Sequence, residues 1–329
     1  MKKLINQPEQ FVDEFLDGIL LAHSGYLRAA GPRSIVRTSA PGERVGIVTG
    51  GGSGHLPLFL GYVGEGLCSG VAVGNVFSSP SADDVLGATR ASDGGRGVLY
   101  LIGNYGGDVM NFELAGELAE LEGIKTETVA FADDVLSAPK EAAQTRRGVA
   151  GLVLAYKCAG AAAQMGQPLQ DVARVARKVG ERLRTVGVGL SPTILPTAGK
   201  PTFELPDGQM EVGIGIHGEP GPFRSQLEPA DQVADRLFDA IAGDLQIEPG
   251  ATVAVLVNGL GATPLEELYL LYRRVHRRLE QRGVSVRHVF VGEYATSLEM
   301  AGASISMLVT DAELDGLLEA PASSPFFRR

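Results

Sequence analysis

The sequence has little cysteine, no tryptophan and no excess of cationic side chains. Its 329 residues include two cysteines, Cys68 and Cys158. Neither stands in a CxxC pair or at zinc-ligand spacing, which excludes a disulfide framework and indicates a reducing compartment. The 29 basic residues against 39 acidic ones give a net charge of −10. A nucleic acid or an anionic membrane is therefore not expected as a partner, because both require a cationic face.

Long apolar runs and targeting signals are also missing. No run of about 18 apolar residues occurs, so no segment is expected to cross a membrane. The N-terminal residues MKKLINQPEQF pass from their charges into a polar stretch rather than into an apolar one, which argues against a signal peptide. These absences predict a cytoplasmic protein.

Glycine, by contrast, is abundant. It accounts for 44 of the 329 residues, nearly twice the usual ~7%. Because the glycines follow no collagen-like period, they indicate tight turns and close approaches of the backbone to a ligand. The length itself predicts two domains, at about 100–200 residues per domain.

Apolar runs alternate with helical patterns through the first half of the chain, which predicts a mainly parallel sheet covered on both faces. The second half has the pattern of a smaller α+β unit. We therefore predict a two-domain α/β fold, with an α/β domain at 1–185 and an α+β domain at 186–329. The expected strands are 45–49, 98–102, 126–131, 186–194, 211–217, 252–257, 284–291 and 304–309. The expected helices are one from Pro8 with Phe11, Phe15 and Ile19 on one face, and 111–121, 148–165, 169–184, 230–242 and 264–282.

Three glycine-dense segments, 50–55, 103–108 and 213–218, each fall at the end of an expected strand. They carry His55, Asp108 and His217. Ligands of open parallel sheets bind beyond the carboxyl ends of the strands, and glycines there let backbone N–H groups approach hydroxyl or phosphoryl oxygens. Ordinary turn glycines explain any one segment by itself. Three such segments together favour a functional site, with His55 and His217 exposed enough to meet a ligand.

Familiar nucleotide-binding loops are absent. The segment GGGSGH at 50–55 places His55 where GxGxxG requires glycine, and no GxxxxGK[ST] occurs, so the chain is not expected to bind a nucleotide by itself. The set of His55, Asp108 and His217 suits general acid–base chemistry, whereas a metal site would favour closer spacing such as HxxxH. Structural positions explain the other histidines, which are His23, His276 and His288.

Several motifs resemble the substrate-binding subunit of dihydroxyacetone kinases. The strongest are GGGSGH at 50–55, NYGGDVMNF at 104–112 and GIHGEPG at 215–221. Further matches are FSSP at 77–80, RRGVA at 146–150, PTAGKP at 196–201, NGLGATP at 258–264 and YATSLEM at 294–300. The resemblance covers essentially the whole chain, in order.

This resemblance implies two α/β domains that assemble as a homodimer and hold a short ketose, such as dihydroxyacetone. The ketose would be a covalent hemiaminal on His217. Asp108 would be the general base that takes the proton of the attacking hydroxyl, and His55 would hydrogen-bond the substrate oxygens. Further substrate contacts are implied for Gly52, Ser53 and Ser79.

The resemblance also implies that this chain binds no cofactor or metal of its own. The family's phosphoryl donor is held by a separate, all-helical domain or subunit. No second, acidic, metal-binding helical segment is found in this sequence, so we expect a partner in trans. That partner would carry Mg²⁺ with ATP, or an ADP that a phosphotransferase-system protein recharges.

Three positions depart from the family's usual pattern. Leu56 and Asn75 stand where glutamate is common, and Gly103 stands where lysine is common. The loss of charged side chains beside the substrate loops favours a wider pocket for a four-carbon ketose such as erythrulose, or a non-catalytic ketone sensor. A metal-dependent aldolase or isomerase that uses the same three residues is a further alternative.

Overall fold

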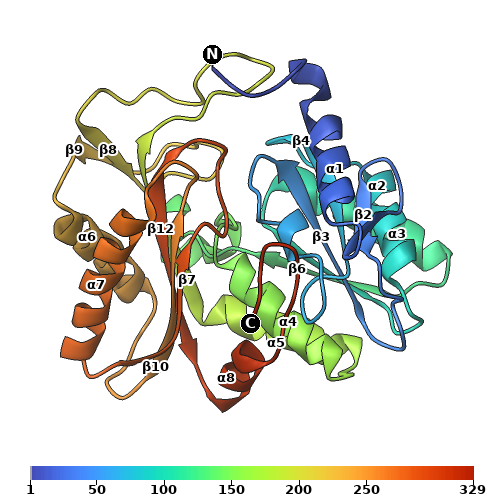
Figure 1. The fold of residues 1–329 in the computed structure, drawn as a ribbon. Coiled ribbons are helices and arrows are strands. Elements are labelled where there is room, and N and C mark those ends of the chain that lie inside the picture. Colours follow the sequence, from blue (N-terminus) through green and yellow to red (C-terminus); the bar gives the residue numbers. More distant parts are fainter. Residues whose placement is uncertain (1) are drawn as a thin grey trace.

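The computed structural model describes residues 2–329, which form two six-stranded sheets (Figure 1). The first sheet has the order β1-β2-β4-β3-β5-β6, and its strands from β4 to β6 run parallel to one another. Its parallel core explains why strands such as β5 are continuous apolar runs, because helices cover both faces. The strands are β1 (Leu27–Ala29), β2 (Ser34–Arg37), β3 (Gly46–Ser53), β4 (Gly70–Val76), β5 (Val98–Gly103) and β6 (Thr126–Phe131).

Successive residues of β5 face opposite layers of helices. Tyr100 and Ile102 pack with residues of α2 and α3, whereas Leu99 and Leu101 pack with residues of α4 and α5. This follows from the two-residue period of a strand. The N-terminal α1 is preceded by a short 3-10 turn. The helices around this sheet are α1 (Phe11–Ala22), α2 (Ala82–Ser92), α3 (Gly106–Leu121), α4 (Leu152–Gln164) and α5 (Leu169–Glu181).

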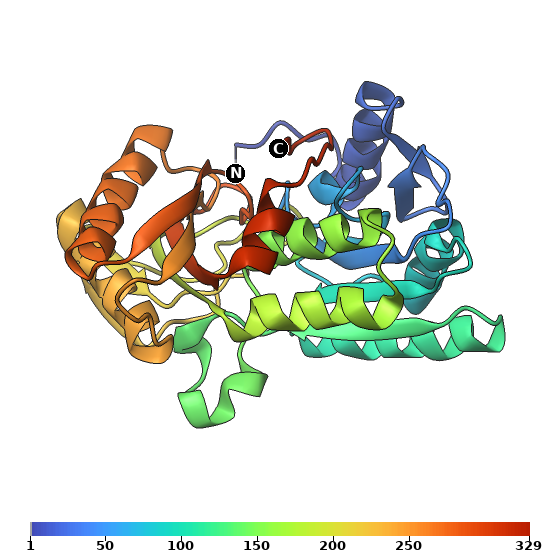
Figure 2. The ribbon, with the colours of Figure 1, turned by 90° about the horizontal axis from the view of Figure 1, so that it is seen from below.

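The second sheet has the order β11-β10-β12-β7-β8-β9, and within it only the β10–β11 pair is parallel. Helices α6 and α7 cover its outer face, and α8 lies beside α4 between the two sheets (Figure 2). The strands are β7 (Leu183–Ser191), β8 (Gln209–Val212), β9 (Phe223–Gln226), β10 (Thr252–Gly259), β11 (Ser285–Gly292) and β12 (Ala301–Thr310). The helices are α6 (Ala230–Asp244), α7 (Leu265–Gln281) and α8 (Ala312–Glu319).

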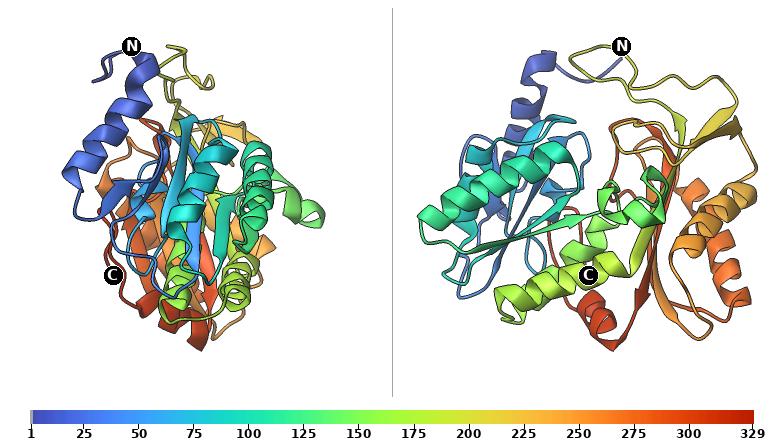
Figure 3. Two further views of the ribbon diagram at one scale, coloured as in Figure 1. Left: turned by 90° about the vertical axis from the view of Figure 1, so that its right-hand side faces the viewer. Right: turned by 180° about the vertical axis from the view of Figure 1, so that it is seen from behind.

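The two sheets share one apolar core. In β10, Ala254 and Leu256 belong to the same buried cluster as α4 and α5, while Val253 and Val255 pack on the α6–α7 side. The N-terminal segment also reaches the second sheet's side of the molecule, because Lys3 pairs with Glu299. It lies at the same end as the 192–208 loop (Figure 3). The division of the chain near residue 185 stays a prediction.

The α/β fold class expected from the sequence is confirmed, and most expected elements are present. The first expected helix begins as the 3-10 turn Pro8–Gln10, and its expected apolar face packs partly buried on the core beside the fully buried Val12 and Leu16. Cys68 and Cys158 are both buried and unpaired. Within residues 2–329, no helix combines the length and apolarity needed to cross a bilayer. Strands β1, β2, β4 and β9 and helices α2 and α8 have no counterpart among the sequence predictions.

Several expected boundaries differ from the structure by three residues or more, and three of them lie at the glycine-rich segments of the candidate site. Gly50–Gly52 belong to β3 rather than following it. These strand positions are glycines because their neighbours pack too closely to leave room for side chains. A Cβ on Gly50 would lie 2.6 Å from the carbonyl oxygen of Ala72, and one on Gly51 would lie 2.4 Å from the ring of Phe59. Helix α3 begins at Gly106 instead of residue 111, and β8 ends at Val212, so that His217 lies in a loop.

We expect Asp133→Asn to destabilise the entrance to α4. Asp133 is buried, and its two carboxylate oxygens accept the backbone N–H groups of Val149 (2.8 Å) and Gly151 (2.9 Å). An asparagine offers one acceptor and turns its amide N–H₂ toward the other donor, so one buried N–H loses its partner, which costs about 1–3 kcal/mol of unfolding free energy. Urea denaturation should show a lower midpoint.

The matched control is Asp171→Asn on α5, where the carboxylate is exposed. Equal midpoints for the two variants would contradict the structural role assigned to Asp133.

Candidate active site

The three glycine-dense segments meet at one place. His55 follows β3, Asp108 stands in the first turn of α3 directly after β5, and His217 lies in the loop after β8. The rings of His55 and His217 are 4.9 Å apart, edge to face. Asp108 is close enough to His217 for the charge of the ring to act on the pKa of its carboxyl group. The structure therefore brings together the three titratable residues expected from the sequence.

His217 is held by Glu219, two residues further along the same loop. The Nδ1–H of His217 donates to Oε1 of Glu219 (2.9 Å), and its backbone N–H donates to Oε2 (3.0 Å). A carboxylate only accepts, so the hydrogen must be on Nδ1, and Nε2 of the neutral ring carries a free lone pair. Within the described residues, Nε2 has no hydrogen-bond partner, and 23% of the side chain is exposed.

An ion pair with Arg147 also fixes Glu219. Arg147 donates to Asp134 (2.9 Å) and to the carbonyl oxygen of Gly213 (2.9 Å), and its Nη1 lies 3.8 Å from Oε2 of Glu219. Burial acts to raise the pKa of Glu219, but the bond from His217, followed by the charges of His217 and Arg147, lowers it to about 2. Glu219 is therefore an ionised acceptor across the physiological pH range.

His55 is buried, so the exposure expected for it from the sequence is wrong. Only 1% of the residue is accessible, because its ring stacks on Phe77 (4.8 Å) and packs edge-on against Phe59. Both phenylalanines have positive φ, +56° and +66°, a strained conformation that is concentrated at functional sites. Phe59 follows His55 by four residues, whereas Phe77 comes from the segment after β4, and no local pattern indicates that second contact.

The environment of His55 keeps its ring neutral with a defined tautomer. Nδ1–H donates to the carbonyl oxygen of Thr296 (2.8 Å). Burial, followed by the nearby His217 ring, lowers the pKa of His55 to about 3. Its Nε2 is a buried acceptor without a partner in the described part of the chain. It is therefore free to accept a hydrogen bond from a ligand hydroxyl.

Asp108 is a buried carboxyl group with one free oxygen. It is 5% exposed, and Oδ1 has no hydrogen-bond partner among the residues described. Burial raises the pKa of Asp108 to about 6, although the Ser79 hydroxyl and the charge of His217 act in the opposite direction. A carboxyl group with this pKa is ionised at neutral pH and still basic enough to accept a proton, as a general base must be.

The remaining expected contact residues surround the same space. Ser53 is buried and its hydroxyl has no partner among the described residues. The backbone of Gly52 lies against Phe77 and Ser78, so closely that a Cβ would be 2.6 Å from the amide nitrogen of Ser78. The Ser79 hydroxyl lies beside Gly107, 2.6 Å from where a Cβ would stand. Their contacts with a substrate remain predictions.

Four residues of the site are not singled out by the sequence patterns. Glu219 and Arg147 fix the reactive loop, while Phe77 and Tyr105 flank the His217 ring at 5.2 Å and 4.8 Å. The spacing His-x-Glu in GIHGEPG is a local signal that identifies Glu219 in retrospect. Arg147 lies in the RRGVA motif, but that motif does not reveal its role, which depends on a contact between segments 66 residues apart.

The other histidines have structural positions. His288 is buried and hydrogen-bonded to Asp315 (3.1 Å), and His276 is exposed on α7. Across residues 2–329, no cluster of three or more histidine, cysteine, aspartate or glutamate side chains is arranged to hold a metal ion.

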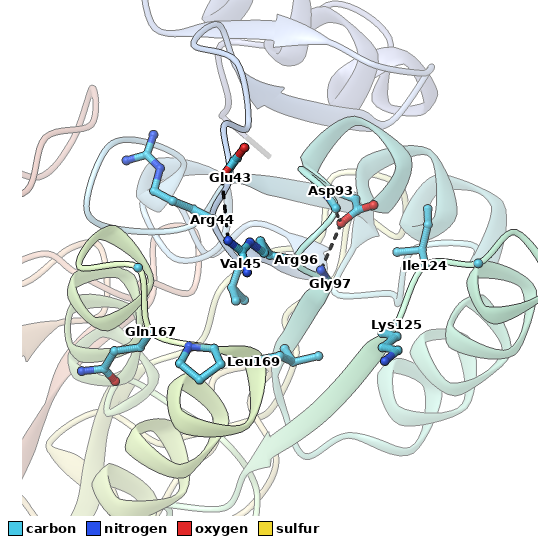
Figure 4. Close-up of a pocket in the computed structure, with 14 residues that line it drawn as sticks. Glu43, Arg44, Val45, Asp93, Arg96, Gly97, Ile124, Lys125, Gln167 and Leu169 are labelled. Atoms are coloured by element: carbon cyan, nitrogen blue, oxygen red, sulfur yellow. Dashed lines mark hydrogen bonds and ion pairs between the residues drawn. The ribbon is translucent and has the colours of Figure 1, made fainter.

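A separate pocket of about 450 Å³ lies at the opposite end of the first sheet (Figure 4). Val45, Gly97 and Lys125 line it, and each immediately precedes a strand, so the pocket is at the amino ends of β3, β5 and β6. Side chains of both charges surround it, including Arg96 and Glu43 in an ion pair. It contains none of the three titratable residues, so we place the functional site at the carboxyl ends of the strands.

Comparisons with known proteins show the family of this chain. A family model described as the Dak1 domain matches residues 17–326. The dihydroxyacetone-binding subunit of the PTS-dependent dihydroxyacetone kinase 2 of Listeria innocua is 44% identical over 331 residues, covering 100% of this chain and 99% of that subunit. The D-erythrulose kinase of Mycolicibacterium smegmatis is 43% identical over 331 residues, and the match covers 100% of this chain and 57% of that kinase.

Solved structures show the same fold. A dihydroxyacetone kinase operon co-activator superposes with a TM-score of 0.88 at 32% identity, over 95% of this chain and 97% of that one. The dihydroxyacetone kinase of C. freundii also gives a TM-score of 0.88, at 31% identity, over 98% of this chain and 59% of the kinase. The match of the family model to nearly the whole chain, together with these identities, shows that this protein belongs to the Dak1 domain family.

Proposed function

We propose that this chain is the ketose-binding subunit of a dihydroxyacetone-type kinase. It holds dihydroxyacetone as a hemiaminal on His217 and presents the terminal hydroxyl to a phosphoryl donor. The observation that carries this proposal is the bond from Nδ1 of His217 to the ionised Glu219, which leaves Nε2 as a nucleophile beside Asp108 and His55. The dihydroxyacetone-binding subunits among the relatives support the same assignment.

The covalent step follows from this geometry. Nε2 of His217 adds to the carbonyl carbon of the ketose, and the ring gains positive charge that the Glu219 carboxylate stabilises. The ring gives up its Nδ1 proton, Glu219 relays it and the former carbonyl oxygen takes it up, so the hemiaminal is neutral and Glu219 is again a carboxylate. A carbinol carbon cannot undergo this addition, and the site therefore selects ketoses over glycerol. The bond also fixes the orientation of a small substrate that offers few other contacts.

Three buried polar atoms are available for the ketose oxygens. They are Nε2 of His55, the hydroxyl of Ser53 and Oδ1 of Asp108, none of which has a partner among the described residues. A buried polar atom without a partner costs about 1–3 kcal/mol, so a bound ketose that pairs with them gains affinity. The neutral His55 accepts a hydrogen bond from one substrate hydroxyl. The Asp108 carboxylate takes the proton of the hydroxyl that attacks phosphorus.

The phosphoryl donor is proposed to lie on a partner. The chain lacks a nucleotide-binding loop, and related subunits are named as parts of PTS-dependent and PEP-dependent kinases. We propose a helical partner subunit that carries Mg²⁺ with ATP, or ADP recharged by a phosphotransferase protein. The C. freundii kinase, solved with AMP-PNP and Mg²⁺, supports a donor of this class. A homodimer and a cytoplasmic location complete the proposal.

A second candidate is a kinase for four-carbon ketoses. Erythrulose kinases are 42–43% identical to this chain, and Gly103 at the end of β5 leaves the space beside Tyr105 without a side chain. A ketone sensor is less well supported, because capture alone has no use for the buried Asp108. With the partner supplied, we expect dihydroxyacetone to give the highest kcat/KM; a higher value for either erythrulose enantiomer would favour the second candidate.

His217→Ala should abolish the covalent adduct. Intact-protein mass spectrometry of the wild type with dihydroxyacetone should show a species heavier by one ketose, and the variant should not. Loss of the oriented substrate should lower kcat/KM at least ~10²-fold in the reconstituted kinase. His276→Ala, at an exposed position on α7, is the control and should keep the adduct. An adduct that persists in His217→Ala would exclude the proposed attachment site.

Asp108→Asn should separate capture from catalysis. The variant should keep the adduct on His217 while kcat falls by ~10²–10⁴-fold, the usual effect of removing a general base. In the wild type, the carboxyl group with a pKa of about 6 must be ionised to accept the proton. The rate should therefore decline as the pH falls through about 6, and this dependence should be absent in the variant. Unchanged turnover in Asp108→Asn would remove this residue from the mechanism.

A further inference from the structure

The N-terminus of α3 presents backbone donors that nothing in the described chain satisfies. The N-cap residue Tyr105 makes no capping bond with its side chain. The N–H groups of Gly106, Gly107 and Asp108 have no acceptor among residues 2–329. At the start of α2, by contrast, the Ser81 hydroxyl accepts from a first-turn amide. Free first-turn amides and the helix dipole together favour an anion.

These donors lie at the candidate active site. The ring of Tyr105 meets the His217 ring edge-on at 4.8 Å, and the Ser79 hydroxyl lies beside Gly107. Asp108, the proposed base, is in the same helical turn, and its Oδ1 is a buried atom without a partner in the described residues. The orphaned carboxylate oxygen points to a ligand hydroxyl at this position, directly beside the free amides of the helix terminus.

The position is also accessible and suited to a negatively charged group. Gly106 and Gly107 are exposed, and a Cβ on Gly106 would meet nothing within 4 Å. The phosphoryl group of a partner's nucleotide can therefore approach these amides from outside. Arg147 is already engaged by Asp134 and by the carbonyl oxygen of Gly213. Strand β5 ends in Gly103, without a cationic side chain. The N-terminus of α3 thus supplies positive potential at a place where neither Arg147 nor position 103 provides a free cationic side chain.

We propose that the amides of Gly106 and Gly107 receive the phosphoryl group during its transfer to the bound ketose. This inference rests on the proposed function and adds a phosphoryl subsite to it. The bond between the terminal phosphorus and the bridging oxygen of the partner's nucleotide breaks, and its electron pair leaves with the nucleoside diphosphate. The ketose oxygen forms the new bond to phosphorus, and its proton goes to Asp108. The amides stabilise the charge on the phosphoryl oxygens in the transition state of the transfer.

Gly106→Pro tests the subsite, with Gly106→Ala as the matched control. Proline at the first helical position removes one N–H at the place where helices tolerate it best. Tyr105 already has the extended conformation that a residue before proline requires, with φ −122° and ψ 136°. Alanine keeps the N–H. We expect kcat of the reconstituted kinase to fall ~10²–10³-fold for proline, as for the loss of one oxyanion donor, and to fall far less for alanine, which adds a methyl group but keeps the donor.

The adduct on His217 separates failure of this inference from failure of the proposed function. Wild type and both variants should form it equally. Equal kcat values for the two variants, with the adduct intact, would overturn the phosphoryl subsite alone. A wild type without the adduct would instead overturn the proposed function.

A second measurement covers the case in which the proline variant does not fold. Inorganic phosphate should be titrated into ¹⁵N-labelled wild type that is saturated with ketose. The amide resonances of Gly106 and Gly107 should shift in a saturable manner. The exposed Gly243 on α6 serves as the internal reference. Resonances of Gly106 and Gly107 that move no more than that of Gly243 would overturn the subsite.

Discussion

The hydrogen bond between His217 and Glu219 is the interaction on which the rest of the site depends. It fixes the hydrogen on Nδ1, makes Nε2 the nucleophile and places a negative charge where the ring becomes positive. Arg147 extends this arrangement to Asp134, at the end of the first sheet, and so ties the reactive loop of the second sheet to the first. Without that tie, His217 would sit on a glycine-rich loop with no defined orientation.

The fold brings this loop to the other two residues. Because the two sheets share one apolar core around α4 and α5, the loops at their ends meet at one place. The crowded glycines of β3 let Phe59 and Phe77 close over His55, which loses solvent and becomes a neutral acceptor. The same burial gives Asp108 the pKa that a base needs. The glycines of β3 thus affect the chemistry of the site, because the room they leave for the two phenylalanines is what buries His55.

The sequence carries most of the site but not its surroundings. His55, Asp108 and His217 could be found because each stands in a glycine-dense segment, and apolar periodicity located most strands and helices. The contact of His55 with Phe77 and the pairing of Arg147 could not be predicted from the sequence, since each joins segments that are not neighbours in the chain. The start of α3 was misplaced because Gly106 and Gly107 oppose helix formation locally, and the helix begins there nonetheless. That exception is the terminus to which we assign the phosphoryl group.

The central claim is a reversible bond between Nε2 of His217 and the carbonyl carbon of a ketose. Its most direct test is ¹³C NMR of dihydroxyacetone labelled at C2, bound to the protein with ¹⁵N-labelled histidine. The account predicts that the carbonyl resonance gives way to that of a tetrahedral carbon coupled to a ring nitrogen of His217. A bound ketose that keeps its carbonyl or hydrate resonance, with no coupling to nitrogen, would contradict it.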